Sequence, residues 1–398
     1  MISINNVVRV NLDLIEDEKI LGDYNTVVYL APVSLLDGAP QVLIDSSEAD
    51  DLESIIMPGN STVIQSIKNY FYNGGRKIIV VDMVSAPVYT LAEFKQKVEA
   101  ARTLSNNFLY VCVSAQLIGS SMYGDPEKAS VADLVDYCDK TESPKKLRML
   151  LTAYNNMNYI TDYEITDSFA AVKYSTKTYD SLPLDSALLI GAYFSQIDLS
   201  GVDTIKDYSY TEEKLLAVDQ DSYLENVTQL EFEALTKNEG NTGYYNFIDG
   251  IGNSTVNFGG NLATVENINI HKDFGAAAVE RDISYSVLTK MLQKQYLTES
   301  GMANIKAAIN SQLQRYKTNG YLNVGAEYSG EDVSINYNGK NYSVIKNGTT
   351  LPQGFYIFSV PVQNISVKDR QDRKFTPIYV VLETQSGARI VEVSGFVR

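Results

Sequence analysis

The chain has 398 residues, with 33 lysines and arginines against 49 aspartates and glutamates, so its formal net charge is −16. That length is ample for two or three domains, and the acidity argues against nucleic acid and anionic membranes as direct partners. No run of 18 apolar residues predicts a membrane span, and the N-terminus lacks the pattern of a signal peptide.

The chain begins with a strand pattern. Over residues 7–14 apolar side chains alternate with polar ones, which is typical of a strand with one apolar face; these apolar residues are Val8, Val10, Leu12 and Leu14. An acidic stretch, residues 16–18, follows. We therefore expect residues 1–22 to form an N-terminal strand arm that pairs within its own domain or with a neighbour.

Residues 23–265 alternate between strand and helix patterns, which predicts an α/β domain with a largely parallel sheet. The expected strands are 26–30, 41–44, 77–83, 107–115, 148–153 and 170–174, and the expected helices are 62–72, 91–104, 129–139 and 184–193. Asn73, Gly74 and Gly75 end the first helix, because glycine tolerates a left-handed backbone. Residues 205–250 have a net charge of −7, which indicates either a solvated acidic face or a docking surface for a basic partner.

A second domain, residues 266–375, is expected to hold a long helix pair and β-strands. Apolar spacing predicts helices over 275–297 and from Ser300, as N-cap, to about 317, with Gly320 after the second helix. Two helices joined by a short link predict an αα-hairpin. Asn338 and Gly339 predict a type I′ hairpin between strands 333–337 and 342–345, and a further strand is expected over 355–362.

The chain ends in strand patterns, 377–384 and 389–397, which form a second hairpin or two extended strands. We expect residues 376–398 to form a C-terminal strand arm whose apolar residues include Ile390, Val391, Val393 and Phe396. Residues 1–24 have a net charge of −3 and residues 365–398 one of +2, so the two ends of different copies would attract head to tail. Both strands could instead complete one sheet within a subunit.

Catalytic chemistry has little support in this sequence. His271 is the single histidine, which excludes a multi-histidine metal site, and no nucleophile elbow accompanies it. We interpret His271 as structural or surface-exposed, and Cys112 and Cys138 as buried thiols. The sequence therefore predicts no catalytic residue, metal site or cofactor.

Four segments, in order, resemble contractile phage tail sheath proteins. They are residues 66–81 (SIKNYFYNGGRKIIVV), residues 186–198 (SALLIGAYFSQID), the helix pair from Glu280-Arg281-Asp282 to Gly301, and an ending with Gly354, Asp369-Arg370, Arg373, Pro377-Ile378 and a strand pair from Gly387. A tryptophan expected after Asp282 is absent. The chain is short for a sheath, so the large outer insertion domains of longer relatives are expected to be missing.

The resemblance implies a structural subunit, not an enzyme. Sheath subunits form a helical homo-oligomer of stacked hexameric rings around a tail tube, and their arms exchange strands with neighbours. Contraction then drives the tube into the target cell. The implied partners are copies of the chain, the tube protein and baseplate and tail terminator proteins, and the implied location is the virion tail, assembled in the host bacterial cytoplasm. The helix pair would face the tube through Lys290, Lys294, Lys306 and Arg315.

Two other classes of function stay open on the residues alone. One is an α/β enzyme that uses carboxylates, which would need a concave pocket with perturbed acids. The other is a non-contractile tail or surface-layer protein, which would share the arms but show one assembled state.

Overall fold

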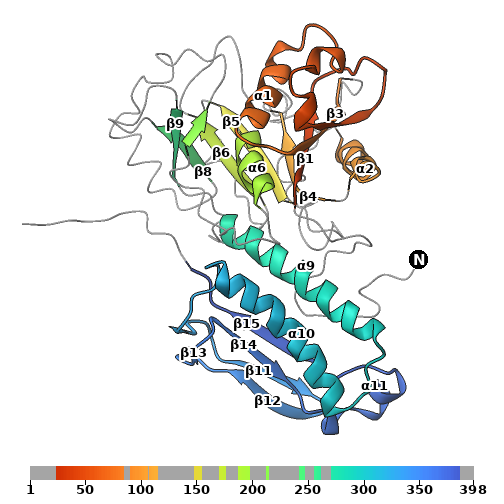
Figure 1. Cartoon of the computed structure of the whole chain (residues 1–398), viewed down its shortest axis with the longest axis vertical. Coiled ribbons are helices and arrows are strands. Elements are labelled where there is room, and N and C mark those ends of the chain that lie inside the picture. Colours follow the sequence, from red (N-terminus) through yellow and green to blue (C-terminus); the bar gives the residue numbers. More distant parts are fainter. Residues whose placement is uncertain are drawn as a thin grey trace, which may run out of the picture. The chain divides into compact units, whose positions relative to one another are not determined.

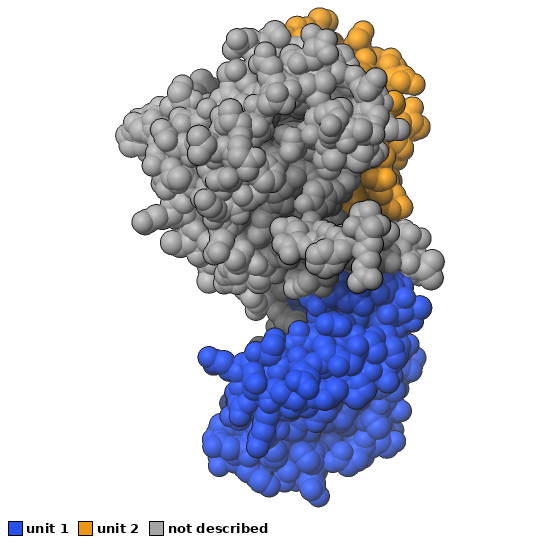
Figure 2. Space-filling view, turned by 90° about the vertical axis from the view of Figure 1, so that its left-hand side faces the viewer, with its two compact units in different colours: residues 1–20, 201–207, 271–398 blue, residues 21–200, 208–270 orange. Residues whose placement is uncertain are grey.

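The computed structural model describes residues 24–84, 90–105, 107–114, 148–154, 170–175, 187–197, 212–214, 242–246, 255–260 and 270–385. These residues divide into two compact units between residues 270 and 271, coloured orange and blue in Figure 2. We call them the N-terminal unit and the C-terminal unit. Together they confirm the mixed α/β class expected from the sequence.

The N-terminal unit is built on one sheet with helices packed on it (Figure 1). Its elements are β1 (Thr26–Ala31), β2 (Gln41–Asp45), η2 (Ser46–Glu48), η3 (Leu52–Ser54), α1 (Ser61–Tyr72), β3 (Lys77–Asp82), α2 (Leu91–Ala101), β4 (Phe108–Val113), β5 (Arg148–Tyr154), β6 (Ala170–Ser175), α6 (Ala187–Gln196), β7 (Glu212–Lys214), β8 (Thr242–Asn246) and β9 (Thr255–Gly260). Each strand and helix predicted here has a counterpart, except the helix over 129–139, which lies outside the described residues.

The sheet has the strand order β2-β3-β1-β4-β5-β6-β8-β9-β7. The strands from β3 to β8 pair in parallel, whereas β2, β9 and β7 pair antiparallel at the two ends. All six residues of β1 and of β4 are buried, as expected for central parallel strands that are covered on both faces. The largely parallel sheet is therefore confirmed.

The C-terminal unit contains a helix hairpin and three small antiparallel sheets. Its elements are α9 (Ile270–Leu292), α10 (Glu299–Thr318), β10 (Ala326–Glu327), β11 (Val333–Tyr337), β12 (Lys340–Ile345), β13 (Thr350–Leu351), β14 (Phe355–Ser359), η4 (Val362–Asn364), α11 (Val367–Gln371) and β15 (Ile378–Leu382). Figure 1 shows α10 running back along α9, with the β-strands on its other side.

Local signals set most boundaries in this unit. Asn338 and Gly339 both have positive φ, 53° and 73°, as a type I′ turn requires. Gly320 has φ 74°, and the N–H groups of Gly320 and Tyr321 bond the carbonyls of Lys317 and Tyr316, which is a Schellman end. The expected N-cap was wrong. Thr298, not Ser300, accepts the bond from the Gly301 N–H, so α10 begins at Glu299, two residues earlier than a Ser300 cap would place it.

The strand predicted over 377–384 is not a free extension. Its core, β15, pairs antiparallel with β14 of the same chain. The part of the C-terminal arm that the structure describes, residues 376–385, is thus integral to the C-terminal unit. Residues 390–396 and the whole N-terminal arm lie outside the described residues.

Candidate functional site

The turn after α1 and the helix α6, the first two segments of the sheath resemblance, pack against each other. Gly74 has φ 87° and sits at the end of α1, where a Cβ would also lie under 3.0 Å from the Gln196 side chain. The Gln196 amide donates to the Asn73 carbonyl at 2.9 Å, and the Arg76 guanidinium donates to the Gln196 carbonyl at 2.6 Å. These bonds hold the end of α6 against the end of α1.

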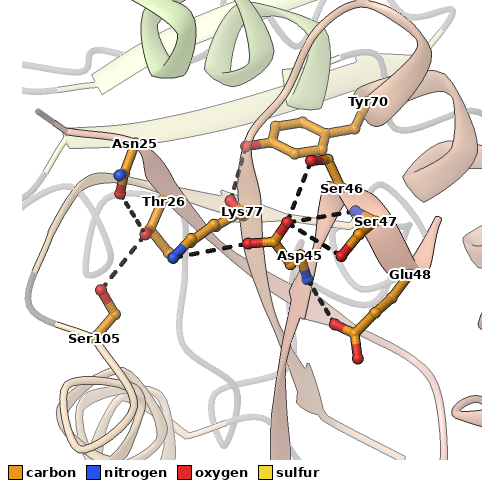
Figure 3. A network of polar contacts seen from close by, with 9 residues as sticks. All are labelled: Asn25, Thr26, Asp45, Ser46, Ser47, Glu48, Tyr70, Lys77 and Ser105. Atoms are coloured by element: carbon orange, nitrogen blue, oxygen red, sulfur yellow. Dashed lines mark hydrogen bonds and ion pairs between the residues drawn. The ribbon is translucent and has the colours of Figure 1, made fainter. Parts of the chain in front are cut away.

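Gly75 is required for a different reason, which is a close approach by Tyr70. A Cβ on Gly75 would lie under 3.0 Å from the Tyr70 ring, which is fully buried. The Tyr70 hydroxyl donates to the Lys77 carbonyl at 2.8 Å (Figure 3). It also lies 3.3 Å from Ser195 Oγ. Burial raises the pKa of Tyr70 far above its usual value, so the hydroxyl stays a donor. Gly74 and Gly75 therefore fix how α1, β3 and α6 pack together.

Asp282 joins the two helices of the hairpin. Its carboxylate accepts bonds from the Arg281 Nε at 3.1 Å, from the Tyr316 hydroxyl at 2.7 Å and from the Arg315 guanidinium. The Arg281 side chain is only 6% exposed and that of Asp282 only 15%. Burial, together with the charge of Asp282, raises the pKa of Tyr316 well above its usual value. The sequence marked Arg281-Asp282 as a motif but gave no sign that α10 supplies its partners.

The four cations expected to face a tube occupy different environments. Arg315 contacts Asp282 within the hairpin, so its charge already has a partner. Lys290 lies in the last turn of α9 with its Nζ 3.5 Å from the Gln293 side-chain oxygen, and Lys294 is exposed in the link after it. Lys306 is half-buried on α10. Lys290 and Lys294 thus lie together where α9 ends, whereas Arg315 lies near the other end of the hairpin.

A second polar cluster fixes the start of α11 against the β11–β12 hairpin. The Tyr337 hydroxyl donates to Asp369 Oδ2 at 2.7 Å, and the Ser366 hydroxyl donates to the same oxygen at 2.8 Å. The Asp369 N–H in turn donates to Ser366 Oγ, which is an N-cap. The hydroxyls of Tyr337 and Ser366 hold the pKa of Asp369 below its usual value.

The β14–β15 ribbon leaves main-chain groups pointing outward. The Val360 N–H bonds the Pro377 carbonyl at 3.2 Å and the Glu383 N–H bonds the Gly354 carbonyl at 3.0 Å. These bonds fix which residues face the partner strand, because facing alternates along an antiparallel pair. On β15 the N–H and C=O groups of Ile378, Val380 and Leu382 therefore point away from β14. On β14 those of Phe355, Ile357 and Ser359 point away from β15. Residues 321–323 pair with residues 383–385 just beyond β15, and among the described residues no other strand pairs with β14 or β15.

The two cysteines and the single histidine are the next residues that the sequence singled out. Cys112 is buried in β4, as expected, whereas Cys138 lies outside the described residues. His271 lies in the first turn of α9. Within the described ranges no helix is long and apolar enough to cross a membrane, and no three potential ligands among His, Cys, Asp and Glu gather as a metal site.

Comparisons with known proteins agree with the motifs. Residues 267–395 match the family model of the E217 tail sheath protein gp31-like C-terminal domain. A chain of the anti-feeding prophage (AFP) baseplate is 13% identical, with a TM-score of 0.62 over 98% of this chain and 99% of that chain. A chain of the AFP helical sheath in the contracted state is 15% identical, with a TM-score of 0.58 and coverage of 98% and 99%.

A third similar structure is the PVC sheath complex of an extracellular contractile injection system, in its contracted state. Its chain is 14% identical, with a TM-score of 0.56 over 98% of this chain and 95% of that chain. No curated protein matches the sequence. The family match and the shared fold confirm the resemblance to the contractile tail sheath family that the four sequence segments indicated.

Proposed function

We propose that this chain is a structural subunit of a contractile tail sheath and not an enzyme. It assembles as stacked hexameric rings around a tail tube, and copies are linked by exchanged N- and C-terminal strands. The matched C-terminal domain model and the similarity to chains from contracted sheaths support this proposal. The similarity to a baseplate chain adds a baseplate as a partner, and a tail terminator is proposed at the far end.

The observation that carries the proposal is the β14–β15 ribbon. A two-stranded ribbon alone is marginally stable, and an unpaired edge is a template for a strand from another chain. Each edge of this ribbon offers three residues with outward main-chain groups. The two edges can each accept one arm from a neighbouring copy. The apolar residues of the N-terminal arm are Val8, Val10, Leu12 and Leu14, and those of the C-terminal arm are Ile390, Val391, Val393 and Phe396.

Contraction follows from this design as a change between two packings of the same rigid units. The arms keep neighbours connected while the units rotate, so the energy comes from the difference between packings and no nucleotide is consumed. The tail tube is the proposed partner of the helix hairpin, through Lys290, Lys294 and Lys306. Arg315 supports this surface through Asp282 instead of contacting the tube. The assembled location is the virion tail, built in the cytoplasm of the host bacterium.

Proline on an outward position of β15 tests the strand exchange. In Val380→Pro the lost N–H points away from β14, so the ribbon keeps its own bonds while an added strand loses one. Val380→Thr is the matched control, because it keeps the N–H and a β-branched side chain. We expect both variants to fold, and only Val380→Thr to assemble with the wild type's critical concentration, measured by sedimentation.

Deletion of the arms is the complementary experiment. The C-terminal deletion must begin at residue 386, because β15 belongs to the C-terminal unit. Variants that lack residues 1–20 or 386–398 should give folded monomers that do not polymerise. Loss of folding in both deletions, or normal assembly of Val380→Pro, would refute strand exchange at this ribbon.

A further inference from the structure

The short helix α11 and the turn after it present a cluster of cations. We call this surface the basic turn; it consists of Lys368, Arg370, Arg373 and Lys374, all exposed. The helix ends in a Schellman arrangement, in which the N–H groups of Arg373 and Lys374 bond the carbonyls of Arg370 and Asp369 at 3.2 and 2.8 Å. Arg373 adopts φ 55° at the position where glycine is preferred. Arginine rarely adopts this left-handed conformation, so the backbone at Arg373 is strained.

The acidic residues of this segment leave most of that positive charge unpaired. The Asp369 carboxylate is held by Tyr337 and Ser366, and the Asp372 carboxylate lies 3.8 Å from Lys374 Nζ. Lys368, Arg370 and Arg373 form no ion pair with any described residue. Val367, at the start of α11, is 75% exposed, so an exposed apolar side chain accompanies the cations.

The N-terminal unit has a segment of opposite charge that also exposes apolar side chains. Residues 34–60 contain six carboxylates and no lysine or arginine. We call the exposed members the acidic rim; they are Asp37, Glu48, Asp50, Asp51 and Glu53. Figure 3 shows residues 45–48 of this segment, where the Glu48 carboxylate accepts a bond from the Asp45 N–H at 2.9 Å and so fixes the turn. Asp50 and Asp51 have no ion pair among the described residues.

Apolar side chains accompany the acidic rim as well. An antiparallel bridge joins Leu35 to Ile56, and the N–H groups of Leu36 and Met57 bond the carbonyls of Ile55 and Ser34 at 2.9 and 3.0 Å. This ribbon carries Leu36, 41% exposed, and Met57, 39% exposed. The segment that carries the acidic rim therefore also exposes apolar side chains, as Val367 does next to the basic turn.

We propose that the basic turn of one copy docks on the acidic rim of a second copy, with Val367 against Leu36 and Met57. Charge complementarity favours a second copy of this chain as the partner of the basic turn. Residues 1–270 carry 18 lysines and arginines against 38 carboxylates, whereas residues 271–398 carry 15 against 11. Packed copies therefore place strongly acidic units near one another, and a basic contact from a neighbour offsets that repulsion. The inference rests on the proposed function, because a sheath brings many copies into contact.

Paired charge reversals test the contact in the full-length protein. Arg370→Glu with Arg373→Glu, or Asp50→Lys with Asp51→Lys, should each raise the critical concentration for assembly about tenfold at low salt. All four substitutions together should bring it back to within about threefold of the wild type. Lys346→Glu and Glu331→Lys, reversals at exposed positions that belong to neither surface, are the matched controls and should change it little.

Arg373→Gly separates assembly from stability. It relieves the left-handed backbone, so it should raise the unfolding temperature while it weakens assembly. The proposal is overturned if either paired reversal raises the critical concentration no more than its control does. It is also overturned if the quadruple variant does not recover assembly, or if reversing the basic turn weakens binding to a tube but leaves assembly of copies unchanged. If the wild type forms no polymer, the sheath function fails. The contact between the basic turn and the acidic rim is then tested by analytical ultracentrifugation at low salt. The wild type should form dimers, and each paired reversal should remain monomeric.

Discussion

Replacing Gly75 by alanine should destabilise the N-terminal unit strongly, although Gly75 does not have a positive φ. The added methyl would lie under 3.0 Å from the Tyr70 ring. That ring is fully buried, and its hydroxyl is held by the Lys77 carbonyl, so it cannot turn away without losing this bond. Overpacking of a rigid core site costs about 1–3 kcal/mol, and we expect a value near the upper end, about 3 kcal/mol. For a unit of this size that is a fall of about 6–12 °C in unfolding temperature.

Differential scanning calorimetry of the full chain measures this fall in the transition of the N-terminal unit. Tyr70→Leu provides the decisive background, because removing the ring removes the clash. Gly75→Ala should then cost less than about 1 kcal/mol beyond Tyr70→Leu alone, so the two changes are non-additive. Gly38→Ala, at an open turn where φ is 63° and a Cβ meets nothing within 4 Å, is a control that reports the cost of a left-handed backbone without a clash. Equal costs of Gly75→Ala in both backgrounds would refute the packing argument.

Three further predictions concern the C-terminal unit. Asp282→Ala removes the carboxylate that bonds Arg281, Tyr316 and Arg315, and should cost about 3 kcal/mol in urea unfolding; a cost below about 1 kcal/mol would contradict the role given to this carboxylate. Thr298→Ala should lower stability by about 1 kcal/mol through loss of the N-cap, whereas Ser300→Ala should change it by less than about 0.5 kcal/mol; the reverse order would restore the original cap assignment. Asp369 has a lowered pKa in the folded state, so its stabilisation is complete above the unfolded value of about 3.9 and is lost as pH falls through the folded value. The melting-temperature gap between wild type and Tyr337→Phe should therefore be constant above about pH 5 and narrow below about pH 4; a gap independent of pH would contradict this.

Features that depend on neighbouring residues in the sequence were predictable. The buried run of β3, the type I′ turn at Asn338-Gly339 and the helix ends at Gly74 and Gly320 are each specified by a few adjacent residues. The parallel sheet also followed, because alternating strands and helices leave few other arrangements. The N-cap of α10 was missed because threonine and serine two positions apart both suit that role.

Features that depend on distant residues were not predictable. Nothing near residue 380 shows that β15 pairs with β14, since its pattern suits a free arm equally well. Arg315 looked like a surface cation because spacing along α10 does not reveal that Asp282 of α9 faces it. The basic turn was visible only as charge, because the left-handed conformation of Arg373 and the inward direction of Asp369 are properties of the fold.

The central claim is that neighbouring copies add strands to the β14–β15 ribbon of a sheath. Cryo-electron microscopy of tubes assembled from the full-length protein, at a resolution that separates strands, tests it most directly. The account predicts hollow, striated tubes in which β15 and β14 each have an additional strand from a neighbouring copy. Tubes whose ribbon edges are unpaired or are covered by the same chain would contradict it.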